Sequence, residues 1–180
     1  MKKFLACILV IFSLGSMYYF SSQDSKTSSK QSNFVVELID EIRNHITLKD
    51  ENLIKIQDKV YNKLKSFGSK SYIVRKMAHF SIYAFIGISL TVFIYTFSRK
   101  LLLSSSLAFI LSIIYACFDE YRQLSVDGRS GSLKDVFIDS SGALMGIIVL
   151  SLVIIFIRLF INIFKKIFSS KTNIKNSLDC

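Results

Sequence analysis

The sequence has no proline, no tryptophan, two histidines and three cysteines among its 180 residues. Cys7, Cys117 and Cys180 have no CxxC spacing, so they do not indicate a disulfide framework. Two histidines are too few for a histidine-rich metal site, although carboxylates alone could hold a hard cation. No serine-hydrolase elbow and no phosphatase signature occurs. The sequence therefore predicts no cofactor and no metal.

Acidic residues are the scarcer charged class, with 13 against 23 basic residues and a net charge of +10. The basic residues border apolar segments, and no nucleic-acid-binding motif is present. Lysines in such positions usually meet anionic lipid headgroups. Membrane lipid is therefore the expected partner, and nucleic acid is not.

Hydrophobic residues are abundant, at 51% of the chain with a mean hydropathy of +0.44, and they come in blocks. Four apolar segments approach the roughly 20 residues that a bilayer-spanning helix needs. They lie at 4–20, 78–97, 101–118 and about 136–157. Backbone groups in lipid must be satisfied internally, so each segment reads as a helix. The chain is therefore expected to be an all-α integral membrane protein with four transmembrane helices.

The first apolar segment follows Lys2 and Lys3 and resembles a signal peptide. The motif "FLAC" also resembles a lipoprotein cleavage box, but only three apolar residues precede Cys7. No small-residue cleavage site with a clear polar break ends the segment. We expect residues 1–20 to be an uncleaved helix.

A small amphipathic helical insert is expected between helices 1 and 2, within residues 21–77. Its serine- and lysine-rich start, 21–32, reads as a linker. Apolar residues then recur at helical spacing after Asn33, a plausible N-cap, and again after Thr47. We expect two short helices on the membrane surface or on the bundle. The other expected parts are helices 2–4 over 78–157, with a motif loop at 119–135, and a basic tail over 158–180.

Polar residues gather at one membrane face, because alternate helices cross the bilayer in opposite directions. The end of helix 1 ("SSQ"), the start of helix 2 ("VRKMAH"), the end of helix 3 ("DEYRQ") and the start of helix 4 ("LKDVFIDSSG") all lie there. The opposite face carries the N-terminus, Arg99-Lys100 and the basic tail. The first face is therefore the candidate site.

Helical spacing aligns these residues further. Arg75, His79 and Tyr83 share a face of helix 2, and Asp119 and Gln123 share a face of helix 3. Ionisable groups at membrane depth are costly, which makes them functional candidates.

A narrow stripe on helix 4 contains Asp135, Asp139, Gly142 and Gly146. Glycines on such a stripe allow a neighbouring helix to approach closely. The stripe should face the bundle interior and turn both aspartates inward.

Four blocks in order, "FSSQ", "RKMAHFSIY", "DEYRQ" and "DGRSGSLKDVFIDSSGALMG", resemble the VanZ family, named for a teicoplanin-resistance accessory protein of Gram-positive bacteria. The resemblance covers about 12–150. One departure is Asp127-Gly128-Arg129, where the family commonly has Pro-Gly-Arg. A turn can still form through Gly128 without proline's restriction of φ.

The resemblance implies candidate site residues, which fall into two groups. The catalytic candidates are His79, Asp119, Glu120 and Asp135. The ligand-binding candidates are Ser22, Gln23, Arg75, Lys76, Tyr83, Gln123, Arg129 and Asp139. Gly128 and Gly142 belong to the same motifs.

The resemblance also implies a task in the bacterial cell envelope, with reduced glycopeptide susceptibility as the expected phenotype. A lipid-linked cell-wall precursor or the glycopeptide itself would then be the ligand. The protein is expected in the bacterial cytoplasmic membrane. Lys2-Lys3, Arg99-Lys100 and Lys165-Lys166 favour a cytoplasmic location for the opposite face, which would put the motif face outside. Eleven Lys or Arg residues in 21–77 weigh against that orientation.

Three interpretations of the polar face stay open. In a membrane-embedded enzyme, His79 would be a general acid or base, with Asp119 or Asp135 as its partner. Arg75 and Arg129 would hold a phosphate or carboxylate. Asp119, Glu120 and Asp139 could hold a divalent cation, although no spacing demands one. A non-catalytic protein would use the same groups to bind a lipid-linked precursor or antibiotic. In the third interpretation, the polar groups have a structural role alone and hold the four helices together.

Overall fold

The computed structural model describes residues 1–45, 69–129 and 131–178, which contain helices and no strand. The helices are α1 (Lys2–Ser21), α2 (Ser25–His45), α4 (Lys70–Ser98), α5 (Leu101–Gln123) and α6 (Leu133–Leu178). The second predicted amphipathic helix, after Thr47, lies outside the described residues.

Four of these helices are long and apolar enough to cross a membrane: α1, α4, α5 and the Leu133–Lys165 part of α6. Each contains at least the roughly 20 residues that a bilayer core requires. The predicted all-α fold with four transmembrane helices is therefore confirmed, and the chain is a multi-pass membrane protein.

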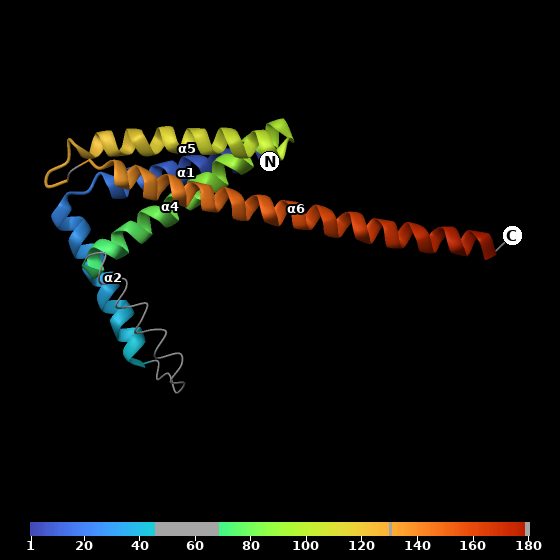
Figure 1. Ribbon diagram of the computed structural model, residues 1–180, viewed down its shortest axis with the longest axis horizontal. Helices are drawn as coiled ribbons and strands as arrows, with labels where there is room; N and C mark the ends of the chain where they lie inside the picture. The colour runs from blue at the N-terminus through green and yellow to red at the C-terminus, as the bar shows by residue number, and fades with distance from the viewer. Residues whose placement is uncertain (46–68, 130, 179–180) are drawn as a thin grey trace.

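The four spanning helices form an antiparallel bundle (Figure 1). The end of α1, the start of α4, the end of α5 and the start of α6 meet at one end, together with the start of α2. The N-terminus lies at the other end, where the ammonium nitrogen of Lys3 is 4.9 Å from the ring centre of Phe97 near the α4–α5 connection. The predicted grouping of the polar helix ends is therefore present.

Glycines bring α6 into backbone contact with α4. A Cβ on Gly142 would lie closer than 3.0 Å to the carbonyl oxygen of Phe80, and one on Gly146 equally close to that of Ala84. From the other side, Gly87 faces the backbone of Ala143 in the same way. The prediction that the helix 4 stripe faces the bundle interior is confirmed. This close packing fixes the start of α6, and its aspartates, against α4.

Small polar residues line the contacts with α1 and α5. The hydroxyls of Ser13 and Ser89 lie 2.8 Å apart, and Ser104 and Ser112 are buried while donating to backbone carbonyls of their own helix. Such residues let helices pack closely in lipid without leaving polar groups unpaired.

The linker prediction for 21–32 is wrong, because α2 already begins at Ser25. The carboxylate of Asp24 accepts a hydrogen bond from the backbone N–H of Thr27 at 3.1 Å, which caps the new helix. The side chain of Thr27, and then its backbone N–H, lower the pKa of Asp24 below its ordinary value through hydrogen bonds to the carboxylate. Asn33 is consequently an interior residue of α2 and not its N-cap, and it accepts a hydrogen bond from Ser71 of α4.

Two other helix boundaries differ from the sequence prediction. Helix α4 begins at Lys70 rather than at residue 78, because Ser69 caps it there. Helix α6 continues through the predicted basic tail to Leu178. Hydropathy marked the part of each helix that fits in lipid, and the helices extend beyond that part.

Replacing Gly142 by alanine should lower the temperature of thermal unfolding in detergent. Overpacking costs about 1–3 kcal/mol, more than the roughly 1 kcal/mol that alanine gains in helix propensity. Gly15→Ala is the matched control, since no atom lies within 4 Å of a Cβ at that position. The close α4–α6 contact would be refuted by a Gly142→Ala protein that unfolds at the temperature of the Gly15→Ala protein.

Candidate functional site

The carboxylate of Asp119 is the centre of a hydrogen-bond network at the polar end of the bundle. Its Oδ2 accepts from the hydroxyl of Ser21 at 2.9 Å and from the side-chain amide of Gln123 at 3.0 Å. Its Oδ1 accepts from the guanidinium of Arg122 at 3.1 Å. Asp119 is 1% exposed, so its charge depends on these donors. The network joins the end of α1 to the end of α5.

Arg122 extends this connection to the backbone of α1. Its guanidinium also donates to the hydroxyl of Ser22 at 2.6 Å and to the carbonyl of Tyr18 at 3.3 Å, and it lies 4.3 Å from the Tyr18 ring centre. Sequence reasoning missed this role for Arg122. Its spacing of three residues from Asp119 on one helix was the available signal.

The motif loop returns to the same network through Arg129. One guanidinium nitrogen donates to Gln123 Oε1 at 3.2 Å, and another donates to the carbonyl of Phe20 at 3.4 Å. Gly128 permits this return, because its φ of 71° is a conformation that residues with a Cβ rarely adopt. The carbonyl of Asp127 also accepts from the backbone N–H of Ser25, so the loop contacts the start of α2.

Two acidic residues fix the start of α6. Glu120 accepts the backbone N–H of Ser132 at 2.6 Å, and Asp135 pairs with Lys76 of α4. Both contacts orient residues that the sequence had placed at the same face. Ser132 was not predicted, since its contribution is a backbone group.

His79 and Asp139 meet deeper in the bundle. The Nδ1 of His79 lies 3.6 Å from Oδ1 of Asp139, which is longer than a hydrogen bond. Asp139 is 1% exposed, and its Oδ2 has no hydrogen-bond partner in the described segments. One ligand atom from each of His79, Asp119 and Asp139 lies within 4.8 Å of the other two.

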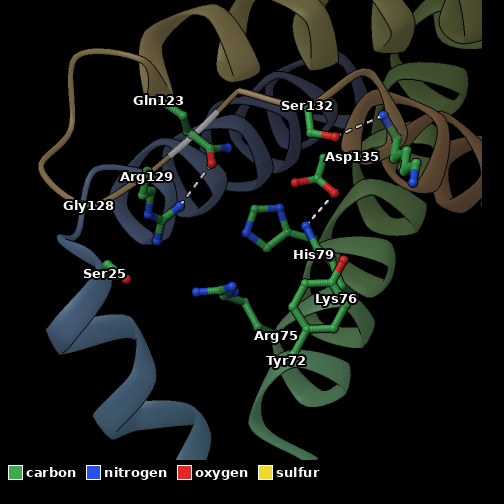
Figure 2. Close-up of a pocket in the computed structure, with 11 residues that line it drawn as sticks. Ser25, Tyr72, Arg75, Lys76, His79, Gln123, Gly128, Arg129, Ser132 and Asp135 are labelled. Atoms are coloured by element: carbon green, nitrogen blue, oxygen red, sulfur yellow. Dashed lines mark hydrogen bonds and ion pairs between the residues drawn. The ribbon is translucent and has the colours of Figure 1, made fainter. Parts of the chain in front are cut away.

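A pocket of about 270 Å³ opens beside this network (Figure 2). Arg75, His79 and Arg129 project toward its interior in Figure 2. Its lining residues come from α2, α4, α5, the motif loop and the start of α6. They are Ser25, Tyr72, Arg75, Lys76, His79, Gln123, Gly128, Arg129, Ser132, Lys134 and Asp135.

Positive charge predominates in this pocket, with four cationic side chains against the single carboxylate of Asp135. Lys76 is paired with that carboxylate. Within the described part of the chain, Arg75 and Lys134 form no ion pair. Burial, and then the charge of Arg75, lower the pKa of Arg129. A guanidinium keeps its proton at neutral pH, so Arg129 is a partly buried positive charge beside a second one, and a bound anion would offset both.

The sequence-predicted residues fall into a lining set and a supporting set. Those lining the pocket are Arg75, Lys76, His79, Gln123, Arg129 and Asp135. Those outside its lining are Ser22, Gln23, Tyr83, Asp119, Glu120 and Asp139. In the second set, Tyr83 is fully buried, and neither its hydroxyl nor Gln23 Oε1 has a hydrogen-bond partner within the described part of the chain. Ser25, Tyr72, Ser132 and Lys134 line the pocket without having been predicted.

The arrangement can bind an anion. Arg75 has no carboxylate partner in the described residues, and Arg129 bonds only to neutral groups, an amide and a carbonyl. Guanidinium groups suit phosphate and carboxylate ligands through paired hydrogen bonds.

The family comparison agrees with these motifs. The model of the VanZ/LLP1 family matches residues 4–158, which include α4, α5, most of α1, most of the spanning part of α6 and every residue of the pocket. No curated protein and no solved structure matched the chain. Because the match covers most of the sequence, the chain belongs to the VanZ/LLP1 family.

Proposed function

We propose that this protein lowers the susceptibility of a bacterium to glycopeptide antibiotics such as teicoplanin. It does so by binding the anionic group of a lipid-linked cell-wall precursor in the pocket at the polar end of the bundle. The observation that carries the proposal is the cationic pocket itself, in which Arg75 and Lys134 have no acidic partner among the described residues.

The size of the pocket limits what it holds. Pockets for whole drug-sized ligands usually measure about 300–1,000 Å³. At about 270 Å³, this one suits the charged end of a ligand and not an entire glycopeptide. A phosphate or carboxylate would enter, and the rest of the molecule would stay in lipid or water.

The position of the pocket suits a lipid-linked ligand. It is built from helix ends, where the spanning segments of α4, α5 and α6 begin or end. A lipid-linked precursor has its phosphate at that depth, below its sugars and above its hydrocarbon chain. The pocket would therefore meet the charged group of such a ligand without removing its tail from the bilayer.

The polar end would face the outside of the cytoplasmic membrane. Lys2, Lys3, Arg99 and Lys100 gather at the opposite end, and basic residues favour the cytoplasmic side. The outer surface is also where a glycopeptide encounters its target.

Catalysis in the same pocket is a second candidate, supported by His79. His79 lines the pocket and lies beside the buried carboxylate of Asp139. The pocket therefore contains a side chain that can act as a general acid or base, next to a carboxylate. An enzyme would protect cells at low copy number, whereas a binder must approach the abundance of its ligand.

Replacing Arg75 by glutamine should remove protection against teicoplanin. A hydrogen bond to a charged group contributes about 1.5–3 kcal/mol, so the anion should bind about 10- to 100-fold more weakly. The measurement is the minimum inhibitory concentration for a deletion strain that carries wild type, Arg75→Gln or Lys100→Gln. Immunoblots of membranes verify equal amounts of each protein.

Lys100→Gln is the matched control, because it removes one positive charge at the opposite end of the bundle and should protect like wild type. Full protection by an Arg75→Gln protein present at the wild-type level would exclude the pocket as the anion-binding site on which protection depends. If wild type itself gives no protection, the resistance proposal fails for this protein.

The outward orientation predicts that a cysteine at position 125 reacts with a membrane-impermeant maleimide in intact cells. Ser125 is exposed in the motif loop. The native cysteines are first replaced by serine, and Lys100→Cys is the control for the opposite end. If Ser125→Cys is labelled only after lysis and Lys100→Cys is labelled in intact cells, the protein has the opposite orientation and the proposed one is wrong.

A further inference from the structure

We propose that His79, Asp119 and Asp139 form a binding site for one divalent metal ion beneath the pocket. The three side chains come from α4, α5 and α6, and each is held by packing between helices. The site is separate from the glycopeptide proposal and does not depend on it.

The spacing of the His79 and Asp139 donor atoms fits coordination to one ion, and Asp119 has a donor atom close by. One donor atom per residue lies within 4.8 Å of the other two, and the His79–Asp139 separation is 3.6 Å. Two ligand bonds of about 2.1 Å that meet at about 120° place their donor atoms about 3.6 Å apart. The gap between His79 and Asp139 is too long for a hydrogen bond and of the right length for two ligands of one metal.

Unsatisfied buried oxygens point to a ligand independently of that spacing. Asp139 is 1% exposed, and its Oδ2 has no hydrogen-bond partner among the residues that the structure describes. The hydroxyl of Tyr83, one helical turn from His79, is fully buried and also unpartnered within those residues. A buried carboxylate oxygen without a donor is costly, and a coordinated cation removes that cost. Tyr83 could then donate to the same carboxylates or to a metal-bound water.

Asp119 keeps capacity for a metal despite its three hydrogen bonds. A carboxylate has about four lone-pair positions, and Ser21, Gln123 and Arg122 occupy three. Arg122 offsets the charge of Asp119, whereas Asp139 pairs only with His79 among the described residues. The site therefore retains negative charge for a cation to neutralise.

The donor set indicates the class of metal. One imidazole and two carboxylates suit Zn²⁺ or Mn²⁺ better than Ca²⁺, which takes oxygen ligands alone. His79 lines the pocket and its side chain is 12% exposed, so an ion or water can reach the site from the pocket. A metal there would add positive charge to the base of an already cationic pocket and could contact a bound phosphate.

The test is metal binding by protein purified in detergent with a tag that contains neither histidine nor cysteine. The protein is stripped with chelator, dialysed against Mn²⁺ or Zn²⁺ and analysed by mass spectrometry for bound metal. Wild type should hold about one ion per chain, as expected for a single three-ligand site. Asp139→Asn and His79→Gln should fall to background. The metal should raise the unfolding temperature of wild type and leave that of Asp139→Asn unchanged.

Asp127→Asn is the control, because it makes the same change in an exposed carboxylate of the motif loop, outside the three-residue cluster and the pocket lining. It should bind metal like wild type. The site would be refuted if wild type held no more metal than folded Asp139→Asn or His79→Gln, or if Asp127→Asn lost metal equally. Each result is independent of antibiotic susceptibility, so this proposal and the proposed function can fail separately.

Discussion

The hydrogen-bonded carboxylate of Asp119 is the interaction on which the polar end of this protein depends. It accepts hydrogen bonds from Ser21 of α1 and from Arg122 and Gln123 of its own helix. The side-chain oxygen of Gln123 in turn accepts a hydrogen bond from Arg129 of the motif loop. A buried charge requires such donors, because their removal leaves it unpaired in a poorly solvated region. The shape of the neighbouring pocket follows from this constraint, since Gln123 and Arg129 form part of its wall.

This network separates residues that build the site from residues that are free to act in it. Asp119, Glu120 and Arg122 are engaged with other parts of the chain, so substitutions there would test folding as well as function. Arg75 projects into the pocket without a carboxylate partner in the described segments, and its loss leaves no buried charge unpaired (Figure 2). The structural interpretation of the polar face and the binding interpretation therefore apply to different residues of the same motifs.

Much of the fold followed from the sequence, because lipid imposes simple rules. Apolar length predicted the spanning helices, and their alternating direction placed four polar segments at one end. The stripe containing Gly142 predicted close contact with another helix. The start of α2 was missed, because capping by Asp24 made a serine-rich segment helical. Hydropathy also understated α6, which continues beyond its apolar part.

The site was predicted as a set of residues but not as a geometry. Helical spacing aligned Arg75 with His79, yet no spacing could show that Arg75 lines a pocket while Asp119 supports it. Arg122 was missed because its partners, Ser22 and the backbone of Tyr18, belong to a helix 100 residues away. The sequence allowed a cation held by carboxylates but predicted no metal, because no spacing could show that one histidine and carboxylates from two other helices lie together.

Thermal unfolding of Asp119→Ala in detergent tests the central claim, that this carboxylate holds the polar end together. Breaking a buried pair should cost about 3 kcal/mol, so Asp119→Ala should unfold well below wild type. Asp127→Ala, which removes an exposed loop carboxylate, and Arg75→Gln should both unfold close to the wild-type temperature. Unfolding of Asp119→Ala at the wild-type temperature, or an equal loss of stability in Arg75→Gln, would contradict the separation of supporting residues from binding residues.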